Sequence, residues 1–359
     1  MLCSKDQRRL FLLLCSLMIY AGAARAQDFQ SMYHERTDFV VQFEVKSVID
    51  GNMVSVTGGV GSIVDRSETH YYIVTNNHIV EDFISRDTVK GTITVDTAQY
   101  RIFVYFRNGY PPVSARVLGR TKDGDLVLLE APVHPLLPSI EPGKLVRQKD
   151  VREGDHVLII GNPHGIPYHY DEGYVGRVGI ISWRASVYFF SIRYPAAPGV
   201  SGSPVINKNG EIIAIMKGWF PASRPQEPVV NPIPLAIPAE FVIRLLPRMK
   251  KGEDIRHGYL SFALKPVSDL SSEERKFYQV PNNVKKGVYV MDIFAGGAAE
   301  RAGLREGDVI TRFDNKEPQD SHEVLDILFF EHSESDKIPI VIYRKGQKLT
   351  ITAILGPEI

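Results

Sequence analysis

The sequence is poor in cysteine and has no surplus of charge of either sign. Its 359 residues include 2 cysteines, Cys3 and Cys15, and 42 basic residues balance 42 acidic ones. Because both cysteines precede residue 27, the rest of the chain can form no disulfide bond and offers no cysteine nucleophile. The balanced charge also argues against nucleic acid as a partner, since phosphate binding requires a basic surplus.

Long apolar runs are scarce as well, and the one near the N-terminus is short. Leu10 to Ala23 is mostly apolar, follows three basic side chains within residues 5–9, and precedes Ala24-Arg25-Ala26. A run shorter than the roughly 20 residues of a spanning helix, followed by small residues that signal peptidase reads, is typical of an export signal. We therefore expect residues 1–26 to be a signal peptide cleaved after Ala26. An uncleaved membrane anchor is the alternative.

What the chain has instead is a series of short segments rich in Val, Ile, Tyr and Phe, separated by turn residues. This texture predicts an all-β sandwich or a pair of β-barrels. Residues 27–38 before it are polar, and we expect a flexible or partner-dependent arm there. The expected strands are 39–45, 53–56, 71–75, 102–106, 126–129, 156–160, 177–182 and 187–193.

The stretch from residue 221 to residue 257 separates two predicted domains. Residues 221–238 contain six prolines, which lack the N–H donor, so we expect an extended surface loop without regular structure. Residues 239–249 have the apolar spacing of an amphipathic helix. Residues 250–257 are charged and broken by glycine, and we place the linker there, between domains at 39–249 and 258–359. The second domain mixes strands with a helix that Asp320 would cap, and ends in a hairpin.

Three polar residues occupy positions that suit acyl transfer. His78 follows the expected strand 71–75, Asp125 opens the next apolar strand, and Ser201 lies between Val200 and Gly202 in a glycine-rich loop. A serine hydroxyl is a weak nucleophile that needs a base, an acid to orient the base, and donors for the oxyanion. The order His, Asp, Ser occurs in known triads, so we interpret these residues as base, orienting acid and nucleophile.

Each of the three also has a simpler interpretation. A serine between glycines and an aspartate before an apolar strand are both common turn residues, and a lone histidine is usually structural. Asp123 is a rival for Asp125, although the strand begins directly after Asp125. Two histidines and two acids in residues 161–172 could indicate a metal site, but their proline- and glycine-rich loop favours a solvated surface. We expect neither a metal nor another cofactor.

Further short motifs surround the triad and follow one another between about residues 40 and 357. In this order they resemble the HtrA (Deg) family, whose members are trypsin-like serine proteases followed by PDZ domains. The motifs are Thr75-Asn76-Asn77-His78, Asp125-Leu126, Gly161-Asn162-Pro163, Pro198-Gly199, Ser201-Gly202, Ala236-Ile237-Pro238, and Gly303 to Ile310.

The resemblance implies a mainly β fold, in which a trypsin-like double β-barrel is followed by an α+β PDZ domain. His78 would act as general base and then acid, Asp125 would orient it, and Ser201 would attack the substrate. The backbone N–H groups of Gly199 and Ser201 would form the oxyanion hole. The resemblance also implies a homotrimer or larger assembly in the bacterial periplasm that degrades unfolded or damaged proteins without ATP.

Two side chains depart from the family pattern beside the nucleophile. Val200 stands where the family usually has Asn or Asp, and Ser203 stands where it usually has glycine. In the trypsin fold the residue six before the nucleophile lies at the base of the primary substrate pocket; here it is Pro195, and the expected pocket wall contains Ile215 and Met216. A pocket without a buried acid cannot pair with Lys or Arg, which predicts cleavage after small or aliphatic residues.

The PDZ resemblance implies a groove that binds extended C-terminal peptides. Tyr259-Leu260-Ser261-Phe262 matches the carboxylate-binding loop of the family, with Ser261 where a glycine is usual. A non-glycine residue would impair binding if this position requires a positive φ. A packing or regulatory domain without a ligand is the alternative.

The leading interpretation is an exported serine endopeptidase that cleaves unfolded proteins and binds C-terminal peptides at its PDZ domain. We expect no permanent membrane anchor. The alternative is a weakly active or inactive protease-fold protein that binds peptides or acts as a chaperone, which Val200 and Ser203 would support. A signalling protease with one dedicated membrane substrate would share the same chemistry.

Overall fold

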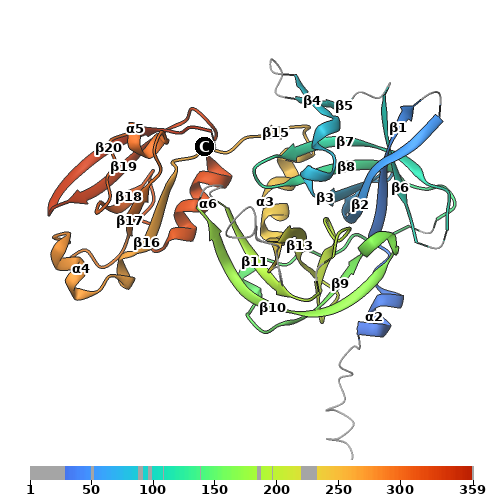
Figure 1. Ribbon diagram of the computed structural model, residues 1–359, viewed down its shortest axis with the longest axis horizontal. Helices are drawn as coiled ribbons and strands as arrows, with labels where there is room; N and C mark the ends of the chain where they lie inside the picture. Colours follow the sequence, from blue (N-terminus) through green and yellow to red (C-terminus); the bar gives the residue numbers. More distant parts are fainter. Residues whose placement is uncertain are drawn as a thin grey trace, which may run out of the picture.

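The computed structural model describes residues 29–49, 52–87, 92–95, 99–107, 109–137, 139–183, 187–195, 197–219 and 233–357. Figure 1 shows two bodies side by side, a larger one built of blue to yellow strands and a smaller one built of orange to red elements. The predicted signal peptide lies outside the described residues. Among the helices of these residues, none is long and apolar enough to cross a membrane.

A short helix, α2 (Phe29–Glu35), begins the described chain. The sequence had predicted a flexible or partner-dependent arm here. Met32 is fully buried and Phe29 is nearly so, and the Phe29 ring meets the edge of His156 at a centroid distance of 4.7 Å. Residues three apart share a helix face, so these two apolar side chains attach the helix to the chain's own second barrel.

The first barrel contains six antiparallel strands. Their order is β7-β6-β1-β2-β3-β8, and the pairing of β7 with β8 closes the barrel. The short hairpin of β4 and β5 and the 3-10 turns η1 and η2 lie outside it. The bounds are β1 (Val40–Ile49), β2 (Asn52–Arg66), β3 (His70–Thr75), η1 (Asn77–Ile79), η2 (Glu81–Phe83), β4 (Ile84–Asp87), β5 (Thr92–Val95), β6 (Tyr100–Tyr105), β7 (Val113–Thr121) and β8 (Leu126–Pro132).

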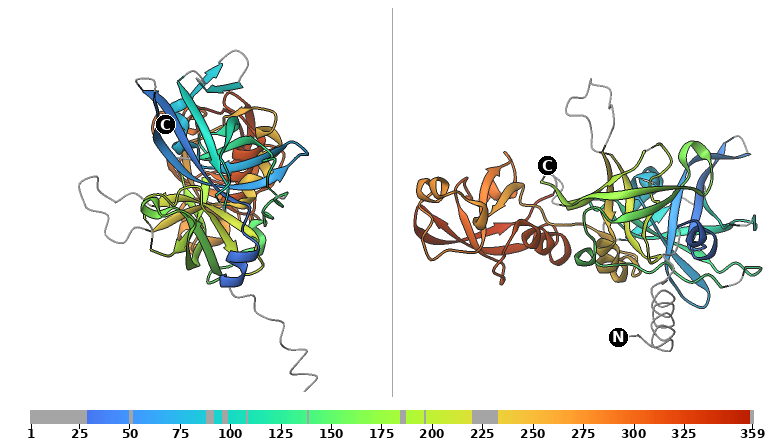
Figure 2. Two further views of the ribbon diagram at one scale, coloured as in Figure 1. Left: turned by 90° about the vertical axis from the view of Figure 1, so that its right-hand side faces the viewer. Right: turned by 90° about the horizontal axis from the view of Figure 1, so that it is seen from below.

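The second barrel closes in the order β10-β11-β14-β13-β12-β9. Together the two barrels confirm the predicted trypsin-like double barrel, and the views of Figure 2 show them packed against each other. The bounds are η3 (Gln148–Asp150), β9 (His156–Gly161), η4 (Pro163–Gly165), β10 (His169–Ser182), β11 (Val187–Arg193), β12 (Pro204–Asn207), β13 (Ile212–Trp219) and β14 (Pro234–Pro238).

Strand β14 corrects the prediction of an extended surface loop over residues 221–238. Residues 234–238 are all buried in the barrel, where Leu235 and Ala236 pair with β11 and Ile237 pairs with β13. The prolines stand at the two ends of the strand, so the three residues between them keep their N–H donors. Residues 220–232 lie outside the described part of the chain.

The predicted helix and linker follow. Helix α3 (Ala239–Met249) has the predicted bounds. The linker contains a strand, β15 (Asp254–Ile255), which pairs in parallel with β7 of the first barrel. Arg120 Nε donates a hydrogen bond to Asp254 Oδ1 at 2.8 Å. The linker is therefore anchored to the barrel.

The C-terminal domain is a five-stranded sheet in the order β16-β17-β18-β19-β20, with helices beside it. Asp320 caps α6 by accepting a hydrogen bond from the Glu323 N–H at 3.0 Å, as the sequence predicted. The bounds are β16 (Phe262–Pro266), η5 (Val267–Asp269), α4 (Ser272–Phe277), β17 (Val288–Ile293), α5 (Ala298–Arg301), β18 (Val309–Phe313), α6 (Ser321–Glu331), β19 (Lys337–Arg344) and β20 (Gln347–Ile354).

Helix α6 joins the C-terminal domain to the barrels, as Figure 1 shows. Its residue Phe329 belongs to the same apolar core cluster as the barrel residues, and its ring lies 4.9 Å from that of Phe241 on α3. Asp326 forms a 2.8 Å ion pair with Arg244 and accepts a 2.9 Å hydrogen bond from the Tyr188 hydroxyl. The two domains thus share both apolar and charged contacts.

Candidate active site

His78 and Asp125 meet in the first barrel. His78 lies in η1, directly after β3, and Asp125 ends the turn that leads into β8. The ring Nδ1 of His78 lies 2.9 Å from Asp125 Oδ2 and 3.0 Å from Oδ1, and the His78 backbone N–H donates to Oδ1 at 2.9 Å. These contacts fix the ring orientation and assign the proton of the neutral imidazole to Nδ1, so Nε2 is left as the base.

Two hydrogen bonds to one backbone carbonyl fix the turn that carries Asp125. Asp125 has a positive φ of 51°, a conformation that Asp tolerates better than most residues. Its carbonyl oxygen accepts hydrogen bonds from the Asn77 N–H at 3.2 Å and from Asn76 Nδ2 at 3.1 Å. The polar residues before His78 therefore position the acid as well as the base.

Asp123, the sequence-level rival, faces the C-terminal domain. Burial raises the pKa of Asp123, while a hydrogen bond from the Tyr259 side chain and one from the His257 backbone oppose this rise. Among the described residues it has no hydrogen bond with His78. The geometry therefore selects Asp125 as the partner of the histidine.

The same turn also contacts the C-terminal domain through His257 and Phe329. Burial lowers the pKa of His257 to about 3, so the ring is neutral; it bonds the Phe329 carbonyl through Nδ1 and the Thr121 hydroxyl through Nε2, at 2.7 Å for the latter. Thr121 Oγ1 in turn accepts the Gly124 N–H at 3.1 Å. A side chain at Gly124 would meet the Phe329 ring at 2.9 Å. Gly124, the residue before Asp125, therefore lies against α6.

A lysine that the sequence interpretation did not single out completes the acid's environment. Lys217 Nζ, from β13 of the second barrel, donates to Asp125 Oδ2 at 2.9 Å. Burial alone would raise the pKa of Asp125, but the hydrogen bond from His78 and the charge of Lys217 outweigh it and hold that pKa below its usual value. The signal in the sequence was a single charged residue, Lys217, within an otherwise uncharged strand.

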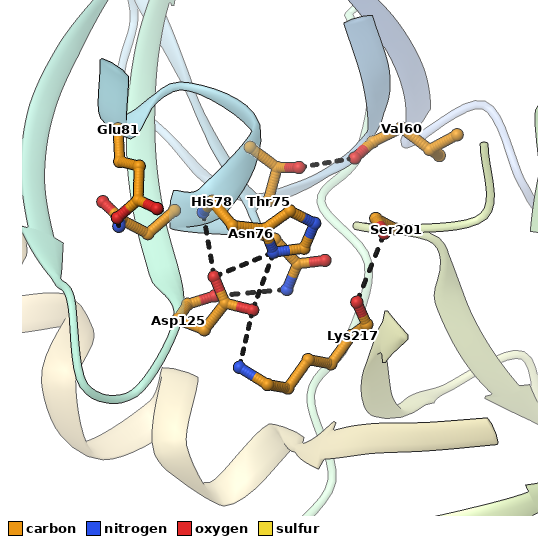
Figure 3. A network of polar contacts seen from close by, with 9 residues as sticks. Val60, Thr75, Asn76, His78, Glu81, Asp125, Ser201 and Lys217 are labelled. Carbon is orange, nitrogen blue, oxygen red and sulfur yellow. Dashed lines mark hydrogen bonds and ion pairs between the residues drawn. The ribbon is translucent and has the colours of Figure 1, made fainter. Parts of the chain in front are cut away.

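Ser201 approaches from the second barrel, and Figure 3 shows it across from the His78 ring. Its Oγ donates to the Lys217 carbonyl oxygen at 3.2 Å. Within the described residues, no hydrogen bond links the Ser201 hydroxyl to His78. The structure thus brings the three predicted catalytic residues to one site, with the serine hydroxyl turned toward the backbone of β13.

The loop before Ser201 leaves two backbone donors available. The N–H groups of Gly199 and Ser201 have no acceptor among the described residues. Gly199 has a φ of 98°, and a Cβ at this position would overlap the carbonyl oxygen of Asn162. Only glycine fits both conditions. The predicted oxyanion donors are therefore present as unpaired groups beside the nucleophile.

The two departures from the family pattern are packed beneath this loop. Val200 and Ser203 are buried, and a side chain on Gly161 would meet Ser203 Oγ at 3.0 Å and Val200 Cγ1 at 3.3 Å. Both residues therefore fill space next to Gly161 and do not occupy the oxyanion site. Among the described residues, the buried hydroxyl of Ser203 has no hydrogen-bond partner.

The residues predicted to form the substrate pocket lie in different surroundings. Pro195 is exposed, whereas Ile215 and Met216 are fully buried in separate core clusters. A cleft of about 640 Å³ opens between the two barrels, beside the loop that precedes Ser201. Its lining includes Gly199, together with Gly58 and Thr57 of β2. The cleft therefore borders the loop that holds Gly199 and Ser201.

The predicted carboxylate-binding loop of the C-terminal domain is buried along its whole length, at Tyr259, Leu260, Ser261 and Phe262. Ser261 has a φ of 63°, so this position does require the conformation that favours glycine. The N–H groups of Leu260 and Ser261 have no acceptor in the described part of the chain. The loop thus keeps donors for an anion despite the serine.

Comparison with known proteins agrees with both domains. A model of the trypsin-like peptidase domain matches residues 59–215, and a model of the PDZ domain matches residues 261–355. A protein named serine protease HtrA-like from Staphylococcus aureus is 27% identical over 308 residues, which cover 82% of this chain and 36% of that protein. A protein of the same name from Staphylococcus epidermidis is 25% identical over 308 residues and 48% of its length. The chain therefore spans between about a third and a half of these curated relatives.

Solved structures share the arrangement of the fold. The HtrA-type protease AlgW with tripeptide has a TM-score of 0.65 and 23% identity, covering 92% of this chain and 97% of that one. The serine endoprotease from Yersinia pestis has a TM-score of 0.59 and 20% identity, covering 92% of this chain and 98% of that one. At these identities the likeness concerns the fold.

Proposed function

Because the chain belongs to the HtrA family of trypsin-like serine proteases with a PDZ domain, we propose that it is a serine endopeptidase that cleaves unfolded or damaged proteins. The observation that carries this proposal is the His78–Asp125 pair of the first barrel, with Ser201 and two unpaired N–H donors presented opposite it by the second. This arrangement supplies a base, an orienting acid, a nucleophile and oxyanion donors.

In the proposed mechanism the Ser201 hydroxyl first turns from the Lys217 carbonyl toward His78. Its oxygen bonds to the substrate's carbonyl carbon while its proton passes to His78 Nε2, and the N–H groups of Gly199 and Ser201 hold the oxyanion. His78 then gives the proton to the leaving amine, which breaks the peptide bond and leaves an acyl-enzyme. Water, deprotonated by the same ring, releases the acid product and restores the serine.

The substrate is proposed to be uncharged at the cleaved position, with a small or aliphatic side chain. Two observations support this preference. The residue six before the nucleophile is Pro195, which carries no charge. Strand β13, the expected pocket wall, contains no acidic residue, so it offers no carboxylate to pair with a Lys or Arg of the substrate. A peptide library in which Lys or Arg dominated the cleaved position would exclude this preference.

The remaining features of the proposal come from the sequence and the family. We propose export to the periplasm after removal of residues 1–26, because of the apolar run and the small residues that end it. Assembly as a homotrimer, and binding of C-terminal peptides at the PDZ loop, are also proposed. The two N–H groups of that loop support the second of these, since a carboxylate is an anion that paired N–H donors bind.

The second candidate is a protein with the protease fold that binds peptides but cleaves them weakly. The bond from the Ser201 hydroxyl to the Lys217 carbonyl favours it, because a serine held there does not give its proton to His78.

The test compares residues 27–359 with the variant Ser201→Ala on unfolded casein. The proposed function predicts loss of cleavage by roughly a million-fold in the variant, and labelling of Ser201 by a fluorophosphonate probe, located by mass spectrometry. Ser203→Ala is the matched control, since this neighbouring serine lies beneath the loop, and it should retain both cleavage and labelling. If casein binds both the parent protein and the Ser201→Ala variant and neither protein cuts it, the second candidate is favoured.

A further inference from the structure

Lys217 contacts the triad at two points. Its ammonium group lies 2.9 Å from Asp125 Oδ2, while its backbone carbonyl accepts the Ser201 hydroxyl at 3.2 Å, as Figure 3 shows. The side chain is about one-third exposed, whereas that of Asp125 is 6% exposed. A residue of the second barrel therefore reaches across to the acid of the first.

The position of the ammonium group matters because His78 and Lys217 share the single negative charge of Asp125. Oδ2 faces both His78 Nδ1 and Lys217 Nζ at 2.9 Å. When the ring takes up a proton during catalysis, it becomes a second cation beside a carboxylate that a lysine already neutralises. Like charges that share one partner at this distance disfavour the second protonation.

We propose that Lys217 is a positioning residue of the triad, which shares the Asp125 carboxylate with His78 and thereby limits how strongly that carboxylate stabilises the protonated ring. Without the lysine, the whole charge of Asp125 would stabilise the protonated ring, and the base would be lost at a higher pH. The consequence for cleavage rests on the proposed function, whereas the consequence for the ring does not.

Other ionisable groups near the triad are farther from the ring or already paired. Glu81 of η2 accepts a hydrogen bond from Asn77 at 3.2 Å and lies 4.0 Å from Lys122. Asp123 is bonded to the C-terminal domain. Of the charged groups in the described part of the chain, Lys217 alone is paired with the Asp125 carboxylate beside His78.

The first test measures the ring directly by NMR. The chain is labelled with 13C at His Cε1 in a Ser201→Ala background, and the His78 signal is assigned from a His78→Gln variant. We expect Lys217→Met, which keeps an unbranched side chain and removes the charge, to move the titration midpoint of the His78 signal up by roughly one pH unit. Lys217→Arg retains the charge and should restore the original midpoint.

A matched control separates this effect from the loss of any lysine. Lys250 also forms an ion pair, at 2.8 Å with Asp65, has a side chain as exposed as that of Lys217, and lies over an aromatic ring, but it is remote from the triad. Lys250→Met should leave the His78 signal unchanged. A titration of Lys217→Met that coincides with the parent would overturn the proposal and assign the lysine the role of neutralising a buried carboxylate.

The second test follows kcat/KM for a peptide substrate against pH, with Ser201 intact. Lys217→Met should move the acid limb of the profile to higher pH by the same amount, so that the parent enzyme keeps more activity than the variant in acid. An acid limb that moves to lower pH would contradict the proposal. If the parent shows no serine-dependent cleavage, the proposed function fails, and the NMR titration still decides the role of Lys217.

Discussion

Two loops in different domains each leave two backbone N–H groups without an acceptor among the described residues. Around Ser201 in the second barrel, the donors are Gly199 and Ser201 itself; in the PDZ domain, they are Leu260 and Ser261. Each loop includes residues with positive φ. In the protease loop these are Gly199, at 98°, and Gly202, at 81°, whereas in the PDZ loop it is Ser261, at 63°.

The comparison shows that where a residue differs from the family pattern matters more than which side chain it introduces. Val200 and Ser203 differ from the family pattern, but neither has a positive φ, and both fill space beside Gly161. The departure in the PDZ loop falls on the strained position itself. A side chain in that conformation costs about 1–2 kcal/mol relative to glycine, so the PDZ loop carries a cost that the protease loop avoids.

The largest expected effect comes from placing a side chain at the corresponding strained position of the protease loop. In Gly199→Ala the new Cβ would overlap the Asn162 carbonyl, so the peptide must rotate and one oxyanion donor turns away. Loss of one such donor lowers kcat by about 100- to 1000-fold. Gly154→Ala is the control, because Gly154 has a similar φ of 88° with open space around it. Retained cleavage in Gly199→Ala would remove this glycine from the oxyanion hole.

A smaller effect is expected at the buried hydroxyl of the protease loop. Ser203 Oγ is buried and has no partner in the part of the chain that the structure describes, and a buried unsatisfied polar group costs free energy. Ser203→Ala removes the hydroxyl and keeps the Cβ beside Gly161, so we expect the free energy of unfolding to rise by about 1 kcal/mol in urea titrations. Ser62→Ala, at another buried serine whose hydroxyl has no partner within the described ranges, should act in the same direction. A less stable Ser203→Ala variant would mean that the hydroxyl has a partner in solution.

The sequence predicted α3 from helical apolar spacing, and a sandwich or a pair of barrels from short segments rich in Val, Ile, Tyr and Phe. The trypsin-like form of the barrels, and the roles of His78, Asp125 and Ser201, were predicted from the order of the motifs and the family resemblance, which no single local signal carries. It missed β14, because the number of prolines in residues 221–238 hid the fact that Pro234 and Pro238 stand only at the two ends of the strand. It also missed Lys217. A lone charge in an otherwise uncharged strand marks Lys217 as unusual. Its pairing with Asp125, however, depends on how one barrel faces the other, and the residues around Lys217 in the chain do not name that partner.

The smallest effect tests the strained position of the PDZ loop. Ser261→Gly removes the strain of a positive φ but gives the unfolded chain more freedom, so we expect a net gain of roughly 0.5 kcal/mol in unfolding free energy. Lys345→Gly, at an exposed hairpin turn with a φ of 49°, is the control for strain outside the loop. Because the donors of the loop are backbone groups, affinity for a peptide with a free C-terminus should not change, as measured by calorimetry. A large gain in affinity would show that the serine side chain itself obstructs the carboxylate, and the two loops would then differ in access and not only in strain.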